Sequence, residues 1–388
     1  MFLSLPRSAT ALALALGLAA VVATAASPAA AQTGAWRDVS PPGSDGSVLF
    51  DVETTRGTTW AVGLRSDDTT RPFAPVAMRW TGTGWQAPPQ PADHGRLDEL
   101  AAGAPDEVWA VGTRYDAVDD TDWGRGSALL QHWNGTAWTE VALPFPEGAT
   151  DTSLSAVAVD EGGSVWVYGG YTDAAGQYVQ ALFRGDADGE ADADGDGGWT
   201  RLPGDTGLNW VSQLEAGPGG VLHAVGDGVS RFDGTSWTKQ SLPPTLDGAL
   251  FDGIQTRTAD DIWAVGHIRD EKLWRHPVVV RFDGRAWRTV RTPAETGQLY
   301  DIAFDGSGRP VVVGETMNPE VDPDGNYVLT PGPRGFLTRT EEPPGAGFLY
   351  GAATDAAGRV WTVGGTAGAE GGISPGRTRA SAAEPPEP

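Results

Sequence analysis

The 388-residue chain contains no cysteine, and this absence excludes several kinds of chemistry. Without thiols there is no lipid-anchored cysteine, no thiol nucleophile, no thiolate metal site and no disulfide. Histidine is scarce, and the five histidines show no spacing typical of a metal site. A Gly-x-Ser-x-Gly match at 372–376 lacks the strand-to-helix elbow on which that motif depends. Stability must therefore come from the size and closure of a hydrophobic core.

Lysine is nearly absent as well. It occurs only at Lys239 and Lys272, and the formal net charge of the chain is −24. A surface of this sign repels the phosphates of nucleic acids and of anionic lipids. We therefore expect no nucleic-acid binding and no binding to membrane surfaces. The simplest interpretation of the charge is solubility.

Long apolar runs are missing apart from one near the N-terminus. Residues 1–31 combine a single charge at Arg7, an apolar stretch over 11–23 and the small residues Ala29-Ala30-Ala31, which is the pattern of a secretory signal peptide. The apolar stretch is too short and too rich in alanine to favour a membrane-spanning helix. We expect cleavage before Gln32 and a secreted, extracellular, monomeric protein without membrane insertion.

The dominant positive feature is an internal repeat. A run of β-branched and aromatic residues that ends in glycine occurs seven times, with the terminal glycines 40 to 57 residues apart. The copies are Thr59–Gly63, Val108–Gly112, Val165–Gly169, Leu222–Gly226, Ile262–Gly266, Val311–Gly314 and Val360–Gly364. This period is the size of one four-stranded blade of a β-propeller.

A second motif follows several of these copies. It consists of an aromatic residue, a short turn that usually contains Asn-Gly or Asp-Gly, and a tryptophan, at Trp80–Trp85, Trp133–Trp138, Phe232–Trp237 and Phe282–Trp287. An aromatic strand end before such a turn predicts a tight hairpin. Each blade is thus expected to contain strands A, B, C and D, with tryptophan leading strand D. In the sixth blade, Phe336 is expected to take the place of that tryptophan.

The two ends of the repeat region complement each other. Residues 36–41 resemble a strand D with no strands before it, whereas the copy that begins at Phe348 lacks a strand D. We therefore predict an all-β fold, a seven-bladed β-propeller with four-stranded antiparallel blades, whose ring is closed by the N-terminal strand joining the last blade. The propeller is predicted to span 32–379, and the Pro/Glu-rich residues 380–388 are expected to form a disordered tail.

The blade layout resembles kelch-type propellers, which share the apolar strand, the glycine, the loop, the aromatic strand and the tryptophan before a proline-terminated strand. The Trp-Ala-Val-Gly and Trp-x-Gly-x-x-Trp patterns are also similar to those of secreted propeller proteins of actinobacteria. The resemblance covers about 350 residues. It implies the architecture and export, and it implies no particular activity.

The innermost strands of a propeller line its central channel, so their aligned positions are candidate binding sites. Alignment on the strand-B glycines places Asp51, Glu99, Asp252 and Asp301 in one column, together with Ala156, Gln213 and Gly351. The column before it includes Tyr300 and Tyr350. Carboxylates repeated around a channel would bind a cation or raise one another's pKa. Alternatively, each carboxylate accepts backbone N–H groups of a neighbouring blade and ties the ring together.

The connections between strands B and C are long and varied, and they emerge on the same face as the connections between blades. They carry the aromatic residues Tyr115, Trp123, Tyr171 and Trp274 beside acidic and arginine residues. Exposed aromatic rings beside polar groups suit sugar rings or the side chains of a protein partner. The alternative is that Trp123 and Trp274 fold back over their own blades.

One acidic loop invites a calcium interpretation. Asp192, Asp194 and Asp196 begin like a calcium-binding loop, but the twelfth position is Pro203 rather than a bidentate glutamate, so the segment is not an EF-hand. We interpret it as a solvated hairpin expansion in which calcium binding is possible, and no other cofactor is expected.

Three functions remain open at this point. The leading hypothesis is a non-catalytic binding module that recognises a glycan or an extracellular protein through the B–C loop face and the channel mouth. The alternatives are an extracellular polysaccharide-acting hydrolase or lyase that uses channel carboxylates, and a structural or assembly protein of the cell envelope. Carboxylates bonded to the backbone of neighbouring blades would remove the residues on which the enzyme hypothesis depends.

Overall fold

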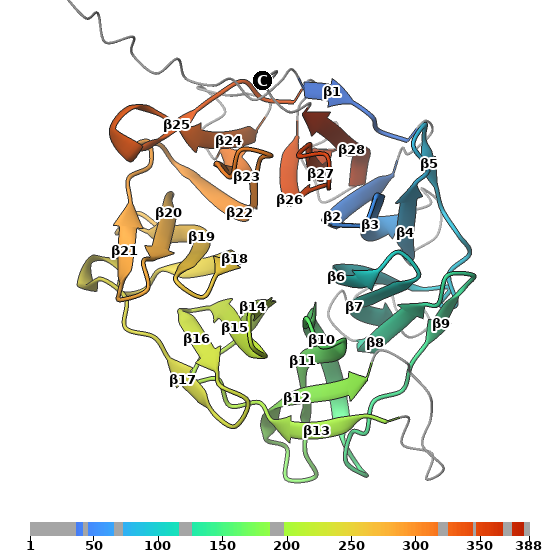
Figure 1. The fold of residues 1–388 in the computed structure, drawn as a ribbon. Coiled ribbons are helices and arrows are strands. Elements are labelled where there is room, and N and C mark those ends of the chain that lie inside the picture. Colours follow the sequence, from blue (N-terminus) through green and yellow to red (C-terminus); the bar gives the residue numbers. More distant parts are fainter. Residues whose placement is uncertain are drawn as a thin grey trace, which may run out of the picture. The chain divides into compact units, whose positions relative to one another are not determined.

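A computed structural model of the chain describes residues 36–41, 46–65, 73–115, 126–186, 198–316, 325–343, 347–367 and 375–383. The chain divides into two units, 1–31 and 32–388, and all described residues belong to the second. They form seven antiparallel sheets of four strands each, arranged as blades around a ring (Figure 1). The predicted seven-bladed β-propeller is thus confirmed. Within the described part, no helix has the length and apolarity that a membrane span requires.

In each of the first four blades, the strands follow one another in chain order from the ring centre to the rim. Blade 1 contains β2 (Ser47–Thr55), β3 (Thr58–Arg65), β4 (Ala74–Trp80) and β5 (Trp85–Gln86). Blade 2 contains β6 (Gly95–Ala104), β7 (Glu107–Tyr115), β8 (Gly126–Trp133) and β9 (Trp138–Glu140). Blade 3 contains β10 (Thr150–Val159), β11 (Ser164–Thr172), β12 (Tyr178–Asp186) and β13 (Thr200–Pro203). Blade 4 contains β14 (Val211–Gly217), β15 (Val221–Gly226), β16 (Val229–Phe232) and β17 (Trp237–Lys239).

The remaining blades follow the same order, and two short 3₁₀ turns lie in the connections at Pro244–Leu246 and Pro333–Gly335. Blade 5 contains β18 (Leu250–Thr258), β19 (Asp261–Arg269), β20 (Arg275–Phe282) and β21 (Trp287–Val290). Blade 6 contains β22 (Gly297–Phe304), β23 (Pro310–Thr316), β24 (Asn326–Pro331) and β25 (Leu337–Arg339). Blade 7 contains β26 (Phe348–Thr354), β27 (Val360–Ala367), β28 (Pro375–Ala383) and, as its outermost strand, β1 (Trp36–Asp38).

The ring closes through the N-terminal strand, as predicted. In blade 7 the strand order is β1-β28-β27-β26, and Trp36 pairs with Ala383 (Figure 1). The predicted tail begins too early, because Ala380–Ala383 belongs to β28 and hydrogen-bonds to both β27 and β1. The whole of β1 pairs with Ser381, Ala382 and Ala383, so these residues complete the last blade rather than a tail. Residues 384–388 lie outside the described part.

Hydrophobic side chains fill the spaces between neighbouring blades. Strands A to C alternate, so that successive side chains pack toward the preceding and the following blade. In blade 2, Leu129 packs against residues of blade 1, whereas Leu130 packs against residues of blade 3. This two-sided burial explains why strand B is apolar at nearly every position and reads as a continuous run rather than an alternating one.

The glycine that ends each strand-B motif has a steric cause. All seven innermost strands show a register shift beside it. In blade 1, Leu49 pairs with Gly63 and Asp51 with Val62, which leaves Phe50 as the bulged residue. A Cβ placed on Gly63 would lie 1.9 Å from the carbonyl oxygen of Val48. The corresponding distances at Gly112 and Gly364 are 2.0 and 1.7 Å. Only glycine therefore lets strand B pass this β-bulge.

The outer hairpins agree with the sequence motif except in blade 6. In blades 1, 2, 4 and 5 the aromatic strand end pairs with the tryptophan of strand D, for example Trp133 with Trp138. In blade 6 the corresponding pair is Pro331 and Leu337. Leu337 is buried, whereas Phe336 is only half-buried beneath the guanidinium of Arg291. The expectation for Phe336 was therefore wrong by one residue, because the 3₁₀ turn shifts the register of this hairpin.

Candidate functional site

The innermost strands place one side chain of each blade at the same height in the central channel. Each pairs with the strand-B residue just before the glycine that ends the strand-B motif. The seven residues are Asp51, Glu99, Ala156, Gln213, Gly253, Asp301 and Gly351. We refer to these seven as the channel column. The sequence alignment had placed Asp252 in it. The structure corrects this, because Asp252 is the bulged residue of blade 5 and Gly253 takes the column position opposite Val265.

Every polar side chain of the channel column binds the backbone of the next blade. Asp51 Oδ2 accepts a hydrogen bond from the N–H of Leu100 at 2.8 Å. Asp301 Oδ2 accepts one from Ala352 at 2.8 Å, and Glu99 Oε2 accepts one from Val157 at 3.0 Å. Gln213 Oε1 accepts from Ile254 at 2.6 Å. In each case the donor is the residue directly after the column position of the next blade.

The two glycines of the channel column achieve the same contact by lacking a side chain. A Cβ on Gly253 would lie 2.5 Å from the carbonyl oxygen of Tyr300, and one on Gly351 would lie 2.9 Å from the Cα of Asp51. The backbones of blades 5 and 6, and of blades 7 and 1, therefore touch directly at this height. The column ties the ring together either through a polar bridge or through close backbone packing.

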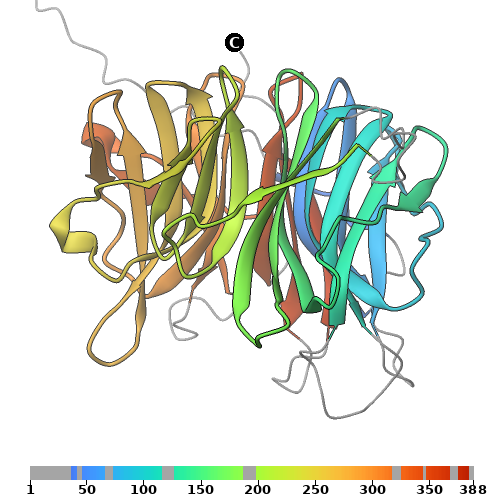
Figure 2. The same ribbon diagram turned by 90° about the horizontal axis from the view of Figure 1, so that it is seen from below.

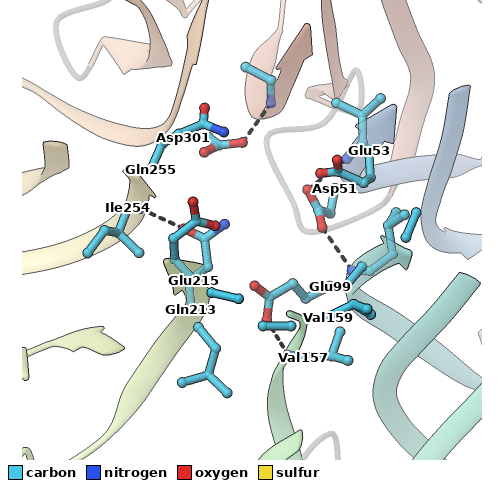
Figure 3. A pocket seen from close by; sticks show the side chains of 18 of the residues that line it. Asp51, Glu53, Glu99, Val157, Val159, Gln213, Glu215, Ile254, Gln255 and Asp301 are labelled. Carbon is cyan, nitrogen blue, oxygen red and sulfur yellow. Dashed lines mark hydrogen bonds between the residues drawn. The ribbon is translucent and has the colours of Figure 1, made fainter. Parts of the chain in front are cut away.

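A second layer of polar residues lies two positions further along the same strands. Because side chains alternate along a strand, Glu53, Glu215 and Gln255 also point into the channel (Figure 3). Glu215 Oε1 accepts a hydrogen bond from the N–H of Thr256 at 2.8 Å. Our sequence analysis missed this layer, although the alternation of side chains around the column residues could have indicated it.

The two layers enclose a cavity of about 130 Å³ at the centre of the ring (Figure 3). Five carboxyl groups line it, and no lysine, arginine or histidine is among the described residues that do so. These five are Asp51, Glu53, Glu99, Glu215 and Asp301. Glu99 and Asp301 are each only 7% exposed. This is a strongly acidic enclosure without a compensating charge.

Burial raises the pKa values of all five carboxyl groups, since it penalises the charged form. The pKa of Asp51 rises to about 6 and that of Glu215 to about 7. The pKa values of Glu53, Glu99 and Asp301 rise well above their usual range, first because of burial and then because of the neighbouring carboxylates. Burial therefore favours the protonated form of these carboxyl groups, whereas a cation in the cavity would favour the ionised form and the release of protons.

The bulged residues form a ring one position before the channel column, on the side of the B–C loops, and we call this ring the channel mouth; none of them lines the cavity itself. They are Phe50, Asp98, Ser155, Ser212, Asp252, Tyr300 and Tyr350, one from each blade. They precede the channel column in strand A and so lie nearer the end where the strand begins. That end carries the B–C loops, such as those that join β11 to β12 and β19 to β20 (Figure 2).

Aromatic side chains occupy one side of the mouth. The ring centroids of Tyr300 and Tyr350 are 4.9 Å apart, and those of Phe50 and Tyr350 are 5.7 Å apart. These three half-buried rings belong to blades 6, 7 and 1, and we call them the aromatic arc. Burial and the nearby Glu315 raise the pKa of Tyr300, whose hydroxyl donates to Glu315 Oε1 at 2.7 Å. Tyr300 therefore stays protonated at neutral pH.

A polar network continues from the aromatic arc into blade 5. Asp252 Oδ2 accepts a hydrogen bond from Gln298 Nε2 at 2.9 Å and lies 3.4 Å from His267 Nδ1. Arg275 binds Gln298 and lies 3.8 Å from Glu315. Asp252 is thus held in place at the mouth, although it is not part of the channel column.

The loop aromatics predicted as ligand contacts differ in accessibility. Trp274 is 48% exposed at the tip of the β19–β20 hairpin. Tyr171 is buried against Phe145, and its hydroxyl accepts a hydrogen bond from Arg201. Tyr115 is half-buried, with its ring centroid 6.5 Å from that of Phe73. The structure thus separates Trp274 from the other two, and a ligand-binding role stays a prediction for all three.

Two predicted features lie outside the described residues. These are Trp123 and the acidic loop with Asp192, Asp194 and Asp196. Within the described residues, no group of three or more histidine, aspartate or glutamate side chains is placed to hold a metal ion. Calcium binding by the acidic loop stays a prediction.

No family model matches the chain. No curated protein matches it either, so the comparisons rest on solved structures. A structure described as YCF48 bound to D1 peptide has a TM-score of 0.56 and 14% identity, covering 92% of this chain and 99% of that one. A catalytically inactive virginiamycin B lyase from Staphylococcus aureus with quinupristin has a TM-score of 0.57 and 12% identity, with 90% and 99% covered.

A third similar structure is the WD40 β-propeller domain of Doa1, with a TM-score of 0.55 and 11% identity over 89% of this chain and 96% of that one. All three identities are low, so the likeness concerns the fold alone. These propellers include both binding proteins and a lyase. The likeness to kelch-type propellers and to exported actinobacterial propellers stays a prediction.

Proposed function

We propose that this propeller is a non-catalytic binding module that holds a protein partner at the channel mouth, on the face of the B–C loops. A cationic side chain or terminus of the partner enters the cavity lined by the five carboxyl groups. The observation that carries this proposal is the position of the aromatic arc, one residue before the channel column and on the B–C loop side of an acidic cavity that no described basic side chain lines.

The aromatic arc and the acidic cavity are both chemically complementary to a basic peptide segment. Aromatic faces attract ammonium and guanidinium groups and offer a large apolar contact. The carboxyl groups below are costly to ionise while the cavity holds no cation, since burial raises their pKa values. A bound cation favours the ionised form, so partner binding is coupled to proton release.

The other candidate functions receive less support. Aromatic rings at the mouth would also suit a glycan, but the carboxyl groups beneath them have no specific role for a neutral sugar. A hydrolase needs carboxyl groups free to act on a substrate. Both oxygens of Asp51 and of Asp301 accept backbone N–H groups, at 2.7 to 2.8 Å. YCF48, which shares the fold, is described with a bound peptide, and this supports protein recognition.

Peptide and glycan arrays probed in parallel with the purified protein test the proposal. We expect signals on lysine- and arginine-containing peptides, none on matched acidic peptides, and none on glycans. Tyr350→Ala should weaken peptide binding about tenfold, because it removes the central ring of the aromatic arc. Glu161→Ala is the control, since Glu161 is exposed in the A–B turn of blade 3, at the end of the strands opposite the B–C loops. Signals confined to glycans, or equal effects of both variants, would refute the proposal.

We also propose that the protein acts outside the cell, on the basis of the signal-like residues 1–31. Mass spectrometry of the protein recovered from culture medium should show a mature N-terminus at Gln32. Retention of the intact chain in the cytoplasm would contradict this location.

A further inference from the structure

The third position before each strand-B glycine is a tryptophan in five of the seven blades. These residues are Trp60, Trp109, Trp166, Trp263 and Trp361, and each packs toward the next blade in the ring. In blade 4 the same position is His223, as its pairing with Arg231 on strand C shows. The equivalent pairs in blades 1 and 5 are Trp60 with Arg79 and Trp263 with Arg281.

At most interfaces, an indole from this position fills the space beside the outer hairpin of the next blade. The ring centroid of Trp60 lies 5.1 Å from that of Trp133 and 5.4 Å from that of Trp138. Trp361 lies 5.3 Å from Trp80 and 5.9 Å from Trp85 in the same way. Three aromatic rings thus close these interfaces.

Between blades 4 and 5 the smaller imidazole leaves this space open. A cavity of about 100 Å³ lies there, lined by His223, Arg231, Gln240, Ile262, Phe282 and Trp287 among others. Phe282 and Trp287 are the equivalents of Trp133 and Trp138, because both pairs are the hydrogen-bonded ends of a C–D hairpin. The cavity therefore lies on the side of His223 where an indole packs at other interfaces. The lining turn residues Pro218 and Ala259 place it on the face opposite the channel mouth.

Two polar groups of this cavity lack the partners that their equivalents have. His223 is 5% exposed, and its Nδ1 has no hydrogen-bond partner among the described residues. In blade 5, Arg281 binds Asp261 at 2.7 Å and stacks on Trp263. In blade 4, Val221 stands where Asp261 does, so Arg231 has neither a carboxylate at that position nor an indole face.

The charge of the site is positive on balance. Burial and the nearby Arg231 lower the pKa of His223 to about 4, so the imidazole is neutral at neutral pH. Arg231 is exposed, and within the described structure it forms no ion pair. The pKa of the exposed Asp233 is lowered mainly by the backbone hydrogen bonds of Ser236 and Thr235 and only in small part by Arg231. The guanidinium is therefore available to an anionic group.

We propose that this cavity is a binding site for a small aromatic carboxylate. The flat ring takes the place of the missing indole between His223 and the Phe282–Trp287 pair. The carboxylate pairs with Arg231 at the exposed end, and a polar ring substituent can satisfy His223 Nδ1. The size limits the ligand to a single six-membered ring, since an engineered apolar cavity of about 150 Å³ holds one benzene molecule.

Benzoate is the probe for a first test, followed by calorimetry and by ¹⁵N chemical shifts of the histidine rings. We expect a dissociation constant of about 0.1 to 1 mM, as is reasonable for nine non-hydrogen atoms. The shift should be confined to His223 among the five histidines. Benzylammonium, which carries the opposite charge on a similar ring, should bind at least about tenfold more weakly. Absence of benzoate binding, or equal binding of both probes, would overturn the proposal.

Two variants test the location of the site. His223→Trp should fill the cavity and abolish benzoate binding. Arg231→Gln should weaken binding about fivefold to tenfold, because one charge-assisted contact is lost. Arg231 is exposed, so this variant tests the proposal even if the His223 variant does not fold. Arg281→Gln is the matched control, since Trp263 fills the equivalent position there. Benzoate binding that survives Arg231→Gln unchanged, or that falls equally in the control, would exclude this site.

Discussion

Two sets of equivalent positions tie neighbouring blades together, and they use different physical forces. The tryptophans of strand B join the blades through buried aromatic contacts, as between Trp361 and Trp80 at 5.3 Å. The channel column joins them through hydrogen bonds from backbone N–H groups to carboxylates, as between Ala352 and Asp301 at 2.8 Å. The first set is insensitive to protonation, whereas the second consists largely of groups that titrate.

The gaps in the two sets show what each contributes. Where the channel column has glycine, at Gly253 and Gly351, the backbones approach more closely and the contact is preserved. Where the tryptophan set has His223, a cavity of about 100 Å³ remains. Near the axis the missing bridge is replaced by direct backbone packing, whereas at His223 a cavity remains. In blade 6, where Val311 has the equivalent position, Val311 packs in one hydrophobic cluster with Trp36 of blade 7. Gaps in the outer set can therefore become binding sites.

The largest effect is expected from removing an indole where the ring closes. Trp361 is 1% exposed, and Trp361→Ala should lower the free energy of unfolding by about 3–5 kcal/mol through the cavity it creates. Denaturant unfolding would measure this. Trp274→Ala, at a position 48% exposed, should change it by no more than about 0.5 kcal/mol. Similar losses in the two variants would show that the interface does not depend on the tryptophan.

The second prediction concerns pH. The pKa of Glu215 is about 7 in the folded protein against 4.5 when unperturbed, so the folded state binds more protons between these values. Stability should therefore fall as pH rises from about 4.5 to 7, by about 3 kcal/mol for this group. Glu215→Gln keeps an acceptor for Thr256 and should be more stable than the parent protein at pH 8.

The matched control for the pH prediction is Glu161→Gln, because Glu161 is an exposed glutamate of an A–B turn. Its thermal melting profile across pH should coincide with that of the parent protein. A Glu215→Gln profile with the parental slope would contradict the assignment of the pH dependence to the channel.

The third prediction removes one polar bridge of the channel column. Asp301→Ala leaves the N–H groups of Ile302 and Ala352 without their acceptor, which should cost about 1–3 kcal/mol. Asp247→Ala, at an exposed position, is the control and should be nearly neutral. Chemical denaturation gives both values. If Asp301→Ala leaves the free energy of unfolding unchanged, the hydrogen bond of Asp301 does not contribute to stability and the prediction is wrong.

The smallest loss of stability is expected at Asp261, which forms hydrogen bonds both to an interface tryptophan and to arginine side chains. Asp261 accepts the indole N–H of Trp263 at 2.8 Å and binds Arg257 and Arg281 at 2.9 and 2.7 Å. Asp261→Asn should cost about 1 kcal/mol, since these contacts lie near solvent. Adding salt should reduce the difference from the parent protein, as measured by thermal melting. A difference that does not depend on salt would assign the effect to the indole bond alone.

The position of the candidate site and several of its residues could be predicted from the sequence, but not its complete set of side chains. Asp51, Glu99 and Asp301 were placed correctly in the channel column, because the distance to the strand-B glycine is constant in most blades. Asp252 was misplaced by one residue, although the spacing of 13 residues to the strand-B glycine, as in Glu99–Gly112, indicates Gly253 in blade 5. Glu53 and Glu215 were missed, although they lie two positions after Asp51 and Gln213 and the alternation of side chains along a strand therefore directs them into the channel as well.

The number of blades, their strand order and the closure by residues 36–38 followed from the sequence alone, because a repeat of glycines, tryptophans and turns encodes local structure. The tertiary structure decided which side chains share the channel, how their pKa values rise and where a cavity remains at His223. These properties depend on burial and on distances between residues from different blades. Neither quantity is set by the local pattern that specifies each blade.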